Sequence, residues 1–291
     1  MTLHVGEQST GIRFDAARIP GRHTISYRIR DAYAGFPART VEVLATPEEL
    51  ETLDREGYLV RERLLPMEEV ERLRAALDET VARERDLEPG GSGFGGIFIR
   101  HLLDKHPAFL EFLRFAPVLS VARAMFGPQI FLRGFTGRVC YPDDPNQEVE
   151  WHFHQNLIPD PLPRWFSRPQ TMDALLYLDD LTELNGPLCV LPGSHRRIAE
   201  DLSTGRFDDI PGQVVLQVPA GSVVMFHGSL WHRALPTRPG GTMRRLLIMG
   251  IGPTWMKGSI YGEKPENGLT RPLLRDGDPE KRELLGAAGF N

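Results

Sequence analysis

From about residue 130 onward the sequence breaks into short strand-like runs separated by turn residues. The runs are rich in β-branched and aromatic residues, and glycine, proline, aspartate or asparagine stands between them. Many short strands with regular turn punctuation are typical of β-sandwiches and β-barrels. The second half of the chain therefore predicts one closed β-core. The runs cover residues 130–132, 136–141, 149–156, 172–178, 188–191, 214–218, 222–226 and 244–251.

Helical signals come before these strands. Thr46-Pro47-Glu48-Glu49 is a capping box with proline at the first helical position, and Gly57 can end the helix that it opens. Pro66 opens a second helix with an apolar face. We expect these helices to pack outside the β-core, in a mainly β fold with flanking α-helices. The apolar face consists of Val70, Leu73, Leu77 and Val81, and further helices are predicted at 107–115, 117–126 and 279–286.

The first 45 residues carry no clear hydrophobic period. They contain scattered glycine and proline, with a short strand-like run near residues 24–28. Residues 1–45 are therefore predicted to be an irregular N-terminal extension, and residues 46–291 a single domain.

The bulk composition excludes several classes of protein. The 291 residues carry a net charge of −5, which argues against nucleic acid and anionic membrane surfaces as partners. Two cysteines, Cys140 and Cys189, are too few for a disulfide-stapled or cysteine-rich zinc fold. We find neither a signal peptide nor an apolar stretch long enough for a membrane helix, so a cytoplasmic protein is expected. The sequence leaves the oligomeric state open.

The stretch Trp151-His152-Phe153-His154 carries the strongest chemical signal. In a strand, alternate side chains share a face, so His152, His154 and Asn156 would point the same way. Two imidazoles two residues apart on one face can both reach one metal ion. The alternative is a pair of polar residues that line a barrel interior or a solvent-exposed face.

Two later elements can complete such a site. His227 and His232 both lie near the end of an apolar strand, and one of them can supply a third ligand while the other is a hydrogen-bonded core histidine. Arg244 and Arg245 begin the last strand, where only one of the two can point inward. An inward arginine can bind the carboxylate of a bound acid, or form a salt bridge with an acidic side chain.

These elements together resemble the phytanoyl-CoA dioxygenase family of Fe(II)/2-oxoglutarate-dependent oxygenases. The resemblance runs from about residue 46 to residue 252 and implies a double-stranded β-helix, the jelly-roll (cupin-like) barrel. The most specific motif is Asn185-Gly186-Pro187-Leu188 followed by Leu191-Pro192-Gly193-Ser194-His195. Other matching stretches are 49–50 to 57–60, 64–77, Trp151-His152, 178–180, Phe226-His227-Gly228, and His232 with Pro236.

The resemblance also implies roles for individual residues. His232, in its His-x-x-x-Pro context, corresponds to the distal metal ligand of the family. Arg244, twelve residues further on, corresponds to the arginine that binds 2-oxoglutarate, with Arg245 as the second choice. Gln155 and Thr136 are expected beside this co-substrate, and O2 is the other reactant.

The chain departs from the family at the His-x-Asp pair of metal ligands. If His152 is the first ligand, His154 stands in place of the carboxylate; if His154 is the first ligand, Asn156 does. We favour the first alignment, because imidazole is a better iron ligand than an amide. A neutral site of three histidines follows, one that should favour an anionic ligand on the metal and that zinc could also occupy.

The leading hypothesis is an enzyme that hydroxylates an unactivated C–H bond of a small-molecule substrate. The alternatives are a three-histidine metal oxygenase that needs no 2-oxoglutarate, and a family member that binds a metal or ligand without turnover. Halogenation is disfavoured, because neither His154 nor Asn156 vacates a metal position. Residues expected at the substrate pocket are Trp165, in the proline-rich insert 159–168, and His195, Arg197 and His227.

Overall fold

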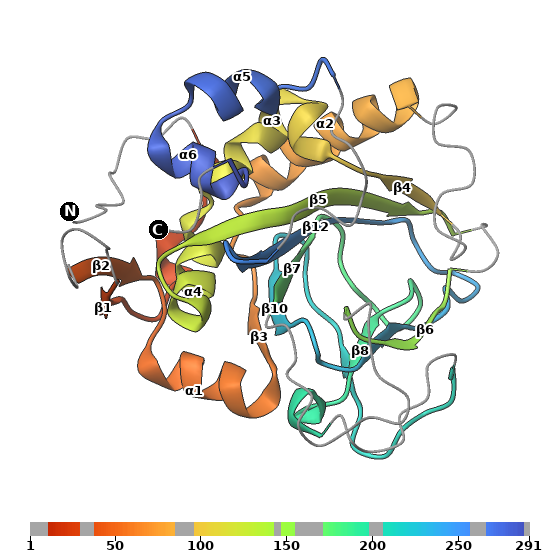
Figure 1. Ribbon diagram of the computed structural model, residues 1–291. Coiled ribbons are helices and arrows are strands. Elements are labelled where there is room, and N and C mark those ends of the chain that lie inside the picture. Colours follow the sequence, from red (N-terminus) through yellow and green to blue (C-terminus); the bar gives the residue numbers. More distant parts are fainter. Residues whose placement is uncertain are drawn as a thin grey trace.

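The computed structural model describes residues 11–29, 38–84, 96–142, 147–154, 171–197, 206–256 and 266–287. Two antiparallel sheets form its core (Figure 1). The larger has the strand order β3-β10-β7-β12-β5-β4 and the smaller β6-β11-β8-β9. Side chains of both sheets line one cavity, so the sheets face each other as the two walls of a jelly-roll barrel. The predicted fold class is confirmed.

The strands and helices have the following bounds. The strands of the two core sheets are β3 (Tyr58–Arg61), β4 (Ile97–Ile99), β5 (Ile130–Cys140), β6 (Val149–His152), β7 (Met172–Tyr177), β8 (Leu188–Val190), β9 (Val214–Leu216), β10 (Val223–His227), β11 (His232–Ala234) and β12 (Arg244–Pro253). The helices are α1 (Pro47–Glu56), α2 (Met67–Glu84), α3 (Pro107–Leu110), α4 (Ala116–Phe126), α5 (Thr270–Asp276) and α6 (Pro279–Leu284), with short 3₁₀ turns η1 (Ala16–Arg18), η2 (Leu102–Asp104), η3 (Glu111–Arg114) and η4 (Ser194–Arg196).

Strand β12 lies in the middle of the larger sheet. It pairs with β5 along its whole length and with β7 from Leu246 to Ile251. One irregularity interrupts the β5 pairing: Gly250 lies opposite Gly134, but Ile251 lies opposite Leu132. Arg133 is therefore the extra residue of a β-bulge.

Helices cover the outer face of the larger sheet (Figure 1). The predicted capping box is present, since Thr46 accepts a hydrogen bond from the Glu49 amide and the Glu49 side chain accepts one from the Thr46 amide. The predicted apolar face of α2 is buried, with Leu77 directly over Gly137 of β5. Phe109 and Phe112 pack against Phe135. The predicted helix at 107–115 is a helical turn, α3, continued by the 3₁₀ turn η3, and α5 was not predicted.

Residues 1–45 were expected to be irregular apart from a strand-like run near residues 24–28, and the structure contains a strand at that run. β1 (His23–Arg28) pairs antiparallel with β2 (Ala38–Val43) from end to end. Val41 and Val43 are buried in the main core, and the Tyr27 hydroxyl donates hydrogen bonds to the backbone of α4. The buried side of β2 is only two valines long, too short for a period to be recognised in the sequence.

Within the described residues, no helix combines the length and the apolar character that crossing a bilayer requires.

Candidate metal centre and cofactor cavity

Three histidines converge inside the barrel. His152 ends β6 and His232 begins β11, and the two residues are direct partners across these antiparallel strands. His154 lies two residues beyond His152, after β6 has ended. One ring nitrogen from each of the three lies within 4.8 Å of those of the other two. This separation matches three ligands around one ion, because metal–nitrogen bonds of about 2.1 Å place two ligand atoms at most about 4.2 Å apart and metal-free side chains relax outward.

Each imidazole is oriented by a contact of its Nδ1 atom. His152 Nδ1 lies 2.8 Å from the backbone carbonyl oxygen of Glu150, and His232 Nδ1 lies 2.8 Å from that of Leu230. His154 Nδ1 lies 2.8 Å from Oδ2 of Asp173. A carbonyl or carboxylate oxygen only accepts, so the proton is on Nδ1 in each ring. The Nε2 lone pairs are then available for a metal, as in most protein metal sites.

The environment also keeps two of these histidines, His152 and His232, neutral. Burial, with a smaller contribution from His154, lowers the pKa of His152 from 6.5 to about 4. Burial lowers the pKa of His232 well below its ordinary value, and His152 and His154 lower it further. Neutral imidazoles are the form that binds metals, so His152 and His232 are ready to bind a metal at neutral pH.

We expect the metal-free protein to lose stability as the pH falls below 6.5. The folded protein holds His152 and His232 neutral, whereas the unfolded chain protonates them at about pH 6.5, so protons favour unfolding from pH 6.5 down to about 4. Each such histidine contributes about 1.4 kcal/mol per pH unit in that range. Urea denaturation between pH 7 and pH 5 should show a shallower pH dependence in His232→Gln than in the wild type. Equal slopes would contradict the prediction.

Asp173 is a buried carboxylate that the sequence analysis missed. It lies on β7 in an otherwise apolar strand, and it contacts His154 as described above. Burial alone would raise the pKa of Asp173, but His154 and the nearby Arg133 hold it below its ordinary value. The carboxylate that the His-x-Asp motif lacks at residue 154 is thus present one step away, behind the imidazole.

The cavity at the histidines continues toward two buried arginines. It has a volume of about 140 Å³. Apart from the three histidines, its lining includes three arginines, Arg138, Arg233 and Arg244. No acidic side chain is among the described lining residues. Arg233 forms ion pairs with Glu148 and Asp209. Arg244, for which no ion pair is found among the described residues, therefore gives this end of the cavity a positive charge.

Arg244 is 3% exposed, and the apolar lining residues around it are Leu175, Leu188, Leu246 and Ile248. One of its Nη atoms lies 3.3 Å from the Cys140 sulfur, while its Nε is buried without a hydrogen-bond partner among the described residues. Burial, together with repulsion from Arg244, lowers the pKa of Arg138. Two buried cations close to each other favour a bound anion.

Arg245 points away from the cavity, as strand alternation requires. Its guanidinium lies 2.9 Å from Asp179 and 2.8 Å from Asp78 on α2. The structure therefore separates the two arginines that the sequence left as alternatives: Arg244 lies inside the barrel and Arg245 forms an external salt bridge.

The predicted pocket residues fall into two groups. His195 and His227 pack against each other with ring centroids 5.2 Å apart, and His195 Nε2 lies 2.9 Å from the Asp54 backbone oxygen. His195, His227 and Arg197 are not among the described residues that line the cavity, and their place at a substrate pocket stays a prediction. On β10, Phe226 faces the cavity and His227 takes the opposite face. Trp165, Gln155 and Asn156 lie outside the described residues.

Thr136 lies inside the barrel. It is opposite Ile248, which lines the cavity, and partners across antiparallel strands share a face. Its hydroxyl is buried and has no hydrogen-bond partner among the described residues. Arg138, two residues further along the same face, was missed, although alternation from Thr136 would have pointed to it. Tyr177, also missed, lines the cavity on β7.

Two facing antiparallel sheets with a histidine cluster and a buried arginine between them define a metal-binding protein of the double-stranded β-helix class. Comparison with known proteins narrows this class to a family. The chain matches the phytanoyl-CoA dioxygenase (PhyH) family over residues 53–246, and it belongs to that family.

Individual relatives are more distant. The chain is 28% identical over 159 residues to an ectoine dioxygenase of Bordetella parapertussis, which covers 52% of this chain and 49% of the relative. It is 27% identical over 209 residues to an L-proline trans-4-hydroxylase of Streptomyces griseoviridis, covering 61% of this chain and 76% of the relative. The chain thus spans about half the length of the ectoine dioxygenases that it matches.

Solved structures share the fold. HygX from Streptomyces hygroscopicus, with nickel and 2-oxoglutarate bound, superimposes with a TM-score of 0.58 at 22% identity, covering 73% of this chain and 89% of that one. The carbocyclase SnoK from nogalamycin biosynthesis, described as α-ketoglutarate-dependent, superimposes with a TM-score of 0.57 at 21% identity, covering 71% of this chain and 83% of that one.

Proposed function

We propose that this protein is an Fe(II)/2-oxoglutarate-dependent oxygenase that hydroxylates an unactivated C–H bond of a small molecule. One observation carries the proposal: the histidine cluster and the buried Arg244 open into the same cavity. Membership of the dioxygenase family and the 2-oxoglutarate bound in the similar fold of HygX support it.

The residues present fit both groups that this activity requires. Three imidazole ligands suit Fe(II), and they leave positions on the metal for other ligands. 2-Oxoglutarate is a dianion, and the cavity offers two buried guanidinium groups with no acidic lining residue among those described. When both are bound, Fe(II) and 2-oxoglutarate together would supply the electrons that reduce O2. 2-Oxoglutarate would be converted to succinate and CO2.

Each residue of the chain has a distinct role in this proposal. The Nε2 atoms of His152, His154 and His232 hold the metal. Arg244 binds the far carboxylate of 2-oxoglutarate with charge-assisted hydrogen bonds, and the unpartnered Thr136 hydroxyl can donate another. The cavity wall formed by Leu175, Phe226 and Ile248 keeps water away from the metal.

The substrate is proposed to be a small molecule. Two curated relatives are named for small molecules, ectoine and L-proline, and HygX has been solved with hygromycin B. These names differ too much to select one compound for this chain.

Anaerobic titration of the Fe(II)-loaded protein with 2-oxoglutarate tests the proposal. We expect the weak visible charge-transfer band of the chelate to appear with one equivalent bound. Zinc-loaded protein is the control, because a zinc chelate gives no such band. An iron-loaded protein that gives no band would contradict the proposal.

The neutral donor set favours one alternative function, an oxygenase in which the substrate itself binds to iron and 2-oxoglutarate is not needed. Three histidines leave the metal with one more unit of positive charge than the His-x-Asp arrangement does, so an anionic substrate could bind directly. Oxygen consumption that requires iron and substrate but proceeds without 2-oxoglutarate would support this alternative.

We expect His154→Asp to retain iron if residue 154 occupies the carboxylate position of the family. The new carboxylate would lie close to Asp173, however, and the two like charges would repel each other in a buried site. The double variant His154→Asp/Asp173→Asn should therefore bind iron more tightly than His154→Asp alone. Asp173→Asn alone should weaken iron binding by about 10- to 100-fold, because it removes the carboxylate that orients the imidazole.

Iron content after dialysis against a competing chelator measures all three variants. A double variant that loses iron completely would show that residue 154 does not occupy the carboxylate position of the family, and would favour the alignment in which His154 is the first ligand and Asn156 takes the carboxylate position.

A further inference from the structure

Arg133 owes its position to the bulge in β5. Regular alternation from Thr136 and Gly134 would turn residue 133 toward the helix layer. The bulge changes this, because Gly250 pairs with Gly134 and Ile251 with Leu132, so Arg133 has no residue opposite it. Bulges commonly re-aim a side chain near an active site.

Two glycines of β12 show where the Arg133 side chain lies. Gly250 is the partner of Asp173, so a Cβ on Gly250 would point to the inner face of the sheet, 3.2 Å from Asp173 Oδ1 and 3.7 Å from Arg133 Cβ. A Cβ on Gly252 would lie 3.1 Å from Arg133 Cδ and 3.5 Å from its Cγ. Arg133 therefore runs along the inner face of β12, in space that any larger residue at 250 or 252 would reduce.

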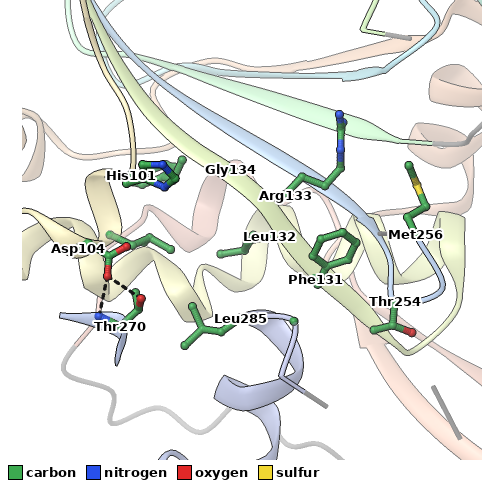
Figure 2. A pocket seen from close by; sticks show the side chains of 13 residues that line it. His101, Asp104, Phe131, Leu132, Arg133, Gly134, Thr254, Met256, Thr270 and Leu285 are labelled. Atoms are coloured by element: carbon green, nitrogen blue, oxygen red, sulfur yellow. Dashed lines mark hydrogen bonds between the residues drawn. The ribbon is translucent and has the colours of Figure 1, made fainter. Parts of the chain in front are cut away.

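The guanidinium of Arg133 forms no direct ion pair, and its charge acts on the nearby buried carboxylate of Asp173. The residue is only 8% exposed, and it forms no hydrogen bond or ion pair with the described part of the chain. It borders a cavity of about 200 Å³. Figure 2 shows its side chain directed away from the hydrogen-bonded pair Asp104 and Thr270 at the other side of that cavity. A guanidinium at a cavity wall with no direct hydrogen-bond partner can offer its N–H donors to a bound anion.

Arg133 and Arg244 lie toward opposite ends of the inner face of β12. Six residues separate Arg244 from Gly250, which corresponds to about 20 Å of antiparallel strand. The histidine cluster contacts the Gly250 end through Asp173. If Arg244 holds 2-oxoglutarate, Arg133 is too far away to share that ligand, and it lies at the end of β12 where Asp173 contacts the histidine cluster.

We propose that Arg133 binds a carboxylate group of the substrate, so that the enzyme acts on small carboxylic acids. This inference rests on the proposed function. A carboxylate is favoured over a phosphate, because the nearby Asp173 carboxylate would repel a dianion more strongly than a monoanion. A planar carboxylate also matches the two parallel N–H donors of a guanidinium.

The test compares acids with their neutral amides. L-Proline, benzoate and hexanoate are each paired with the primary amide, and succinate formation that depends on the added compound is measured with Fe(II) and saturating 2-oxoglutarate. We expect at least one acid to stimulate succinate formation more than tenfold over its amide in the wild type. In Arg133→Gln this preference should disappear through a rise in KM of at least tenfold, and Arg133→Lys should restore part of it.

Two further variants complete the design. Gly252→Ala keeps the guanidinium but displaces it, and should raise the KM for the acid without changing the 2-oxoglutarate band. Arg114→Gln, which removes a partly exposed arginine paired with Asp278 and Glu280, is the matched control and should behave as the wild type. Thermal unfolding midpoints show whether each variant is folded.

The outcomes separate this inference from the function on which it rests. Equal stimulation by acids and amides, stimulation by none of the acids, or an unchanged acid preference in Arg133→Gln overturns the inference, provided that the 2-oxoglutarate band is present. Absence of that band in wild-type protein overturns the proposed function instead.

Discussion

Substitution of His232 by alanine is expected to lower the affinity for iron by at least about 100-fold, because a three-histidine site loses one of its three protein ligands. The expected loss is large for a structural reason. His232 is 4% exposed, its ring is fixed through Nδ1, and its partner across the strand pair is His152, so no other described histidine can move into its place.

His227→Ala is the matched control for this substitution. His227 lies only five residues away, but it packs against His195 on the opposite face of β10 and should not affect the metal. Iron content measured after gel filtration, together with metal-dependent thermal stabilisation, compares the two variants. Stoichiometric iron in His232→Ala would remove His232 from the ligand set.

The second large effect is expected at Arg244. Arg244→Met keeps most of the side-chain volume but removes the charge, and it leaves a buried carboxylate of 2-oxoglutarate without its partner. Loss of one member of a buried, hydrogen-bonded charge pair costs about 2–5 kcal/mol, so the affinity for 2-oxoglutarate should fall by about 30- to 3,000-fold. Iron binding should not change, because Arg244 contacts none of the three histidines in the structure.

Arg245→Met provides the comparison for Arg244→Met. Its charge is paired with Asp179 and Asp78 outside the barrel, so the variant should be less stable but should bind 2-oxoglutarate normally. The anaerobic titration described above measures both. If the Arg244→Met variant binds 2-oxoglutarate as tightly as the wild type, Arg244 is excluded as the residue that binds 2-oxoglutarate.

The barrel and most helices could be predicted because their signals are local. Strand alternation, turn residues and the capping box at Thr46 each depend on a few neighbouring residues, and the structure contains all of them. The strand β2, its pairing with β1, and α5 were not predicted. The buried side of β2 consists of two valines, and Pro272 stands inside the short sequence of α5, where it obscures the helical pattern.

The residues of the candidate site also fall into those with a local sequence signal and those without one. His152, His154, His232 and Arg244 were found from patterns within single segments and from the family resemblance. Asp173 and Arg138 were missed because their roles depend on contacts between strands that are far apart in sequence. Arg133 could not be placed at all, since the bulge reverses the face that alternation assigns to it.

The central position of β12 has a consequence for how this protein can diverge. Both edges of the strand are hydrogen-bonded, and its alternate residues include Arg244 facing in and Arg245 facing out. Insertion or deletion of one residue inside β12 would exchange these two arginines and turn the whole inner row of side chains outward. Descendants of this sequence should therefore change β12 by substitution only, and should gain or lose length in the segments between strands.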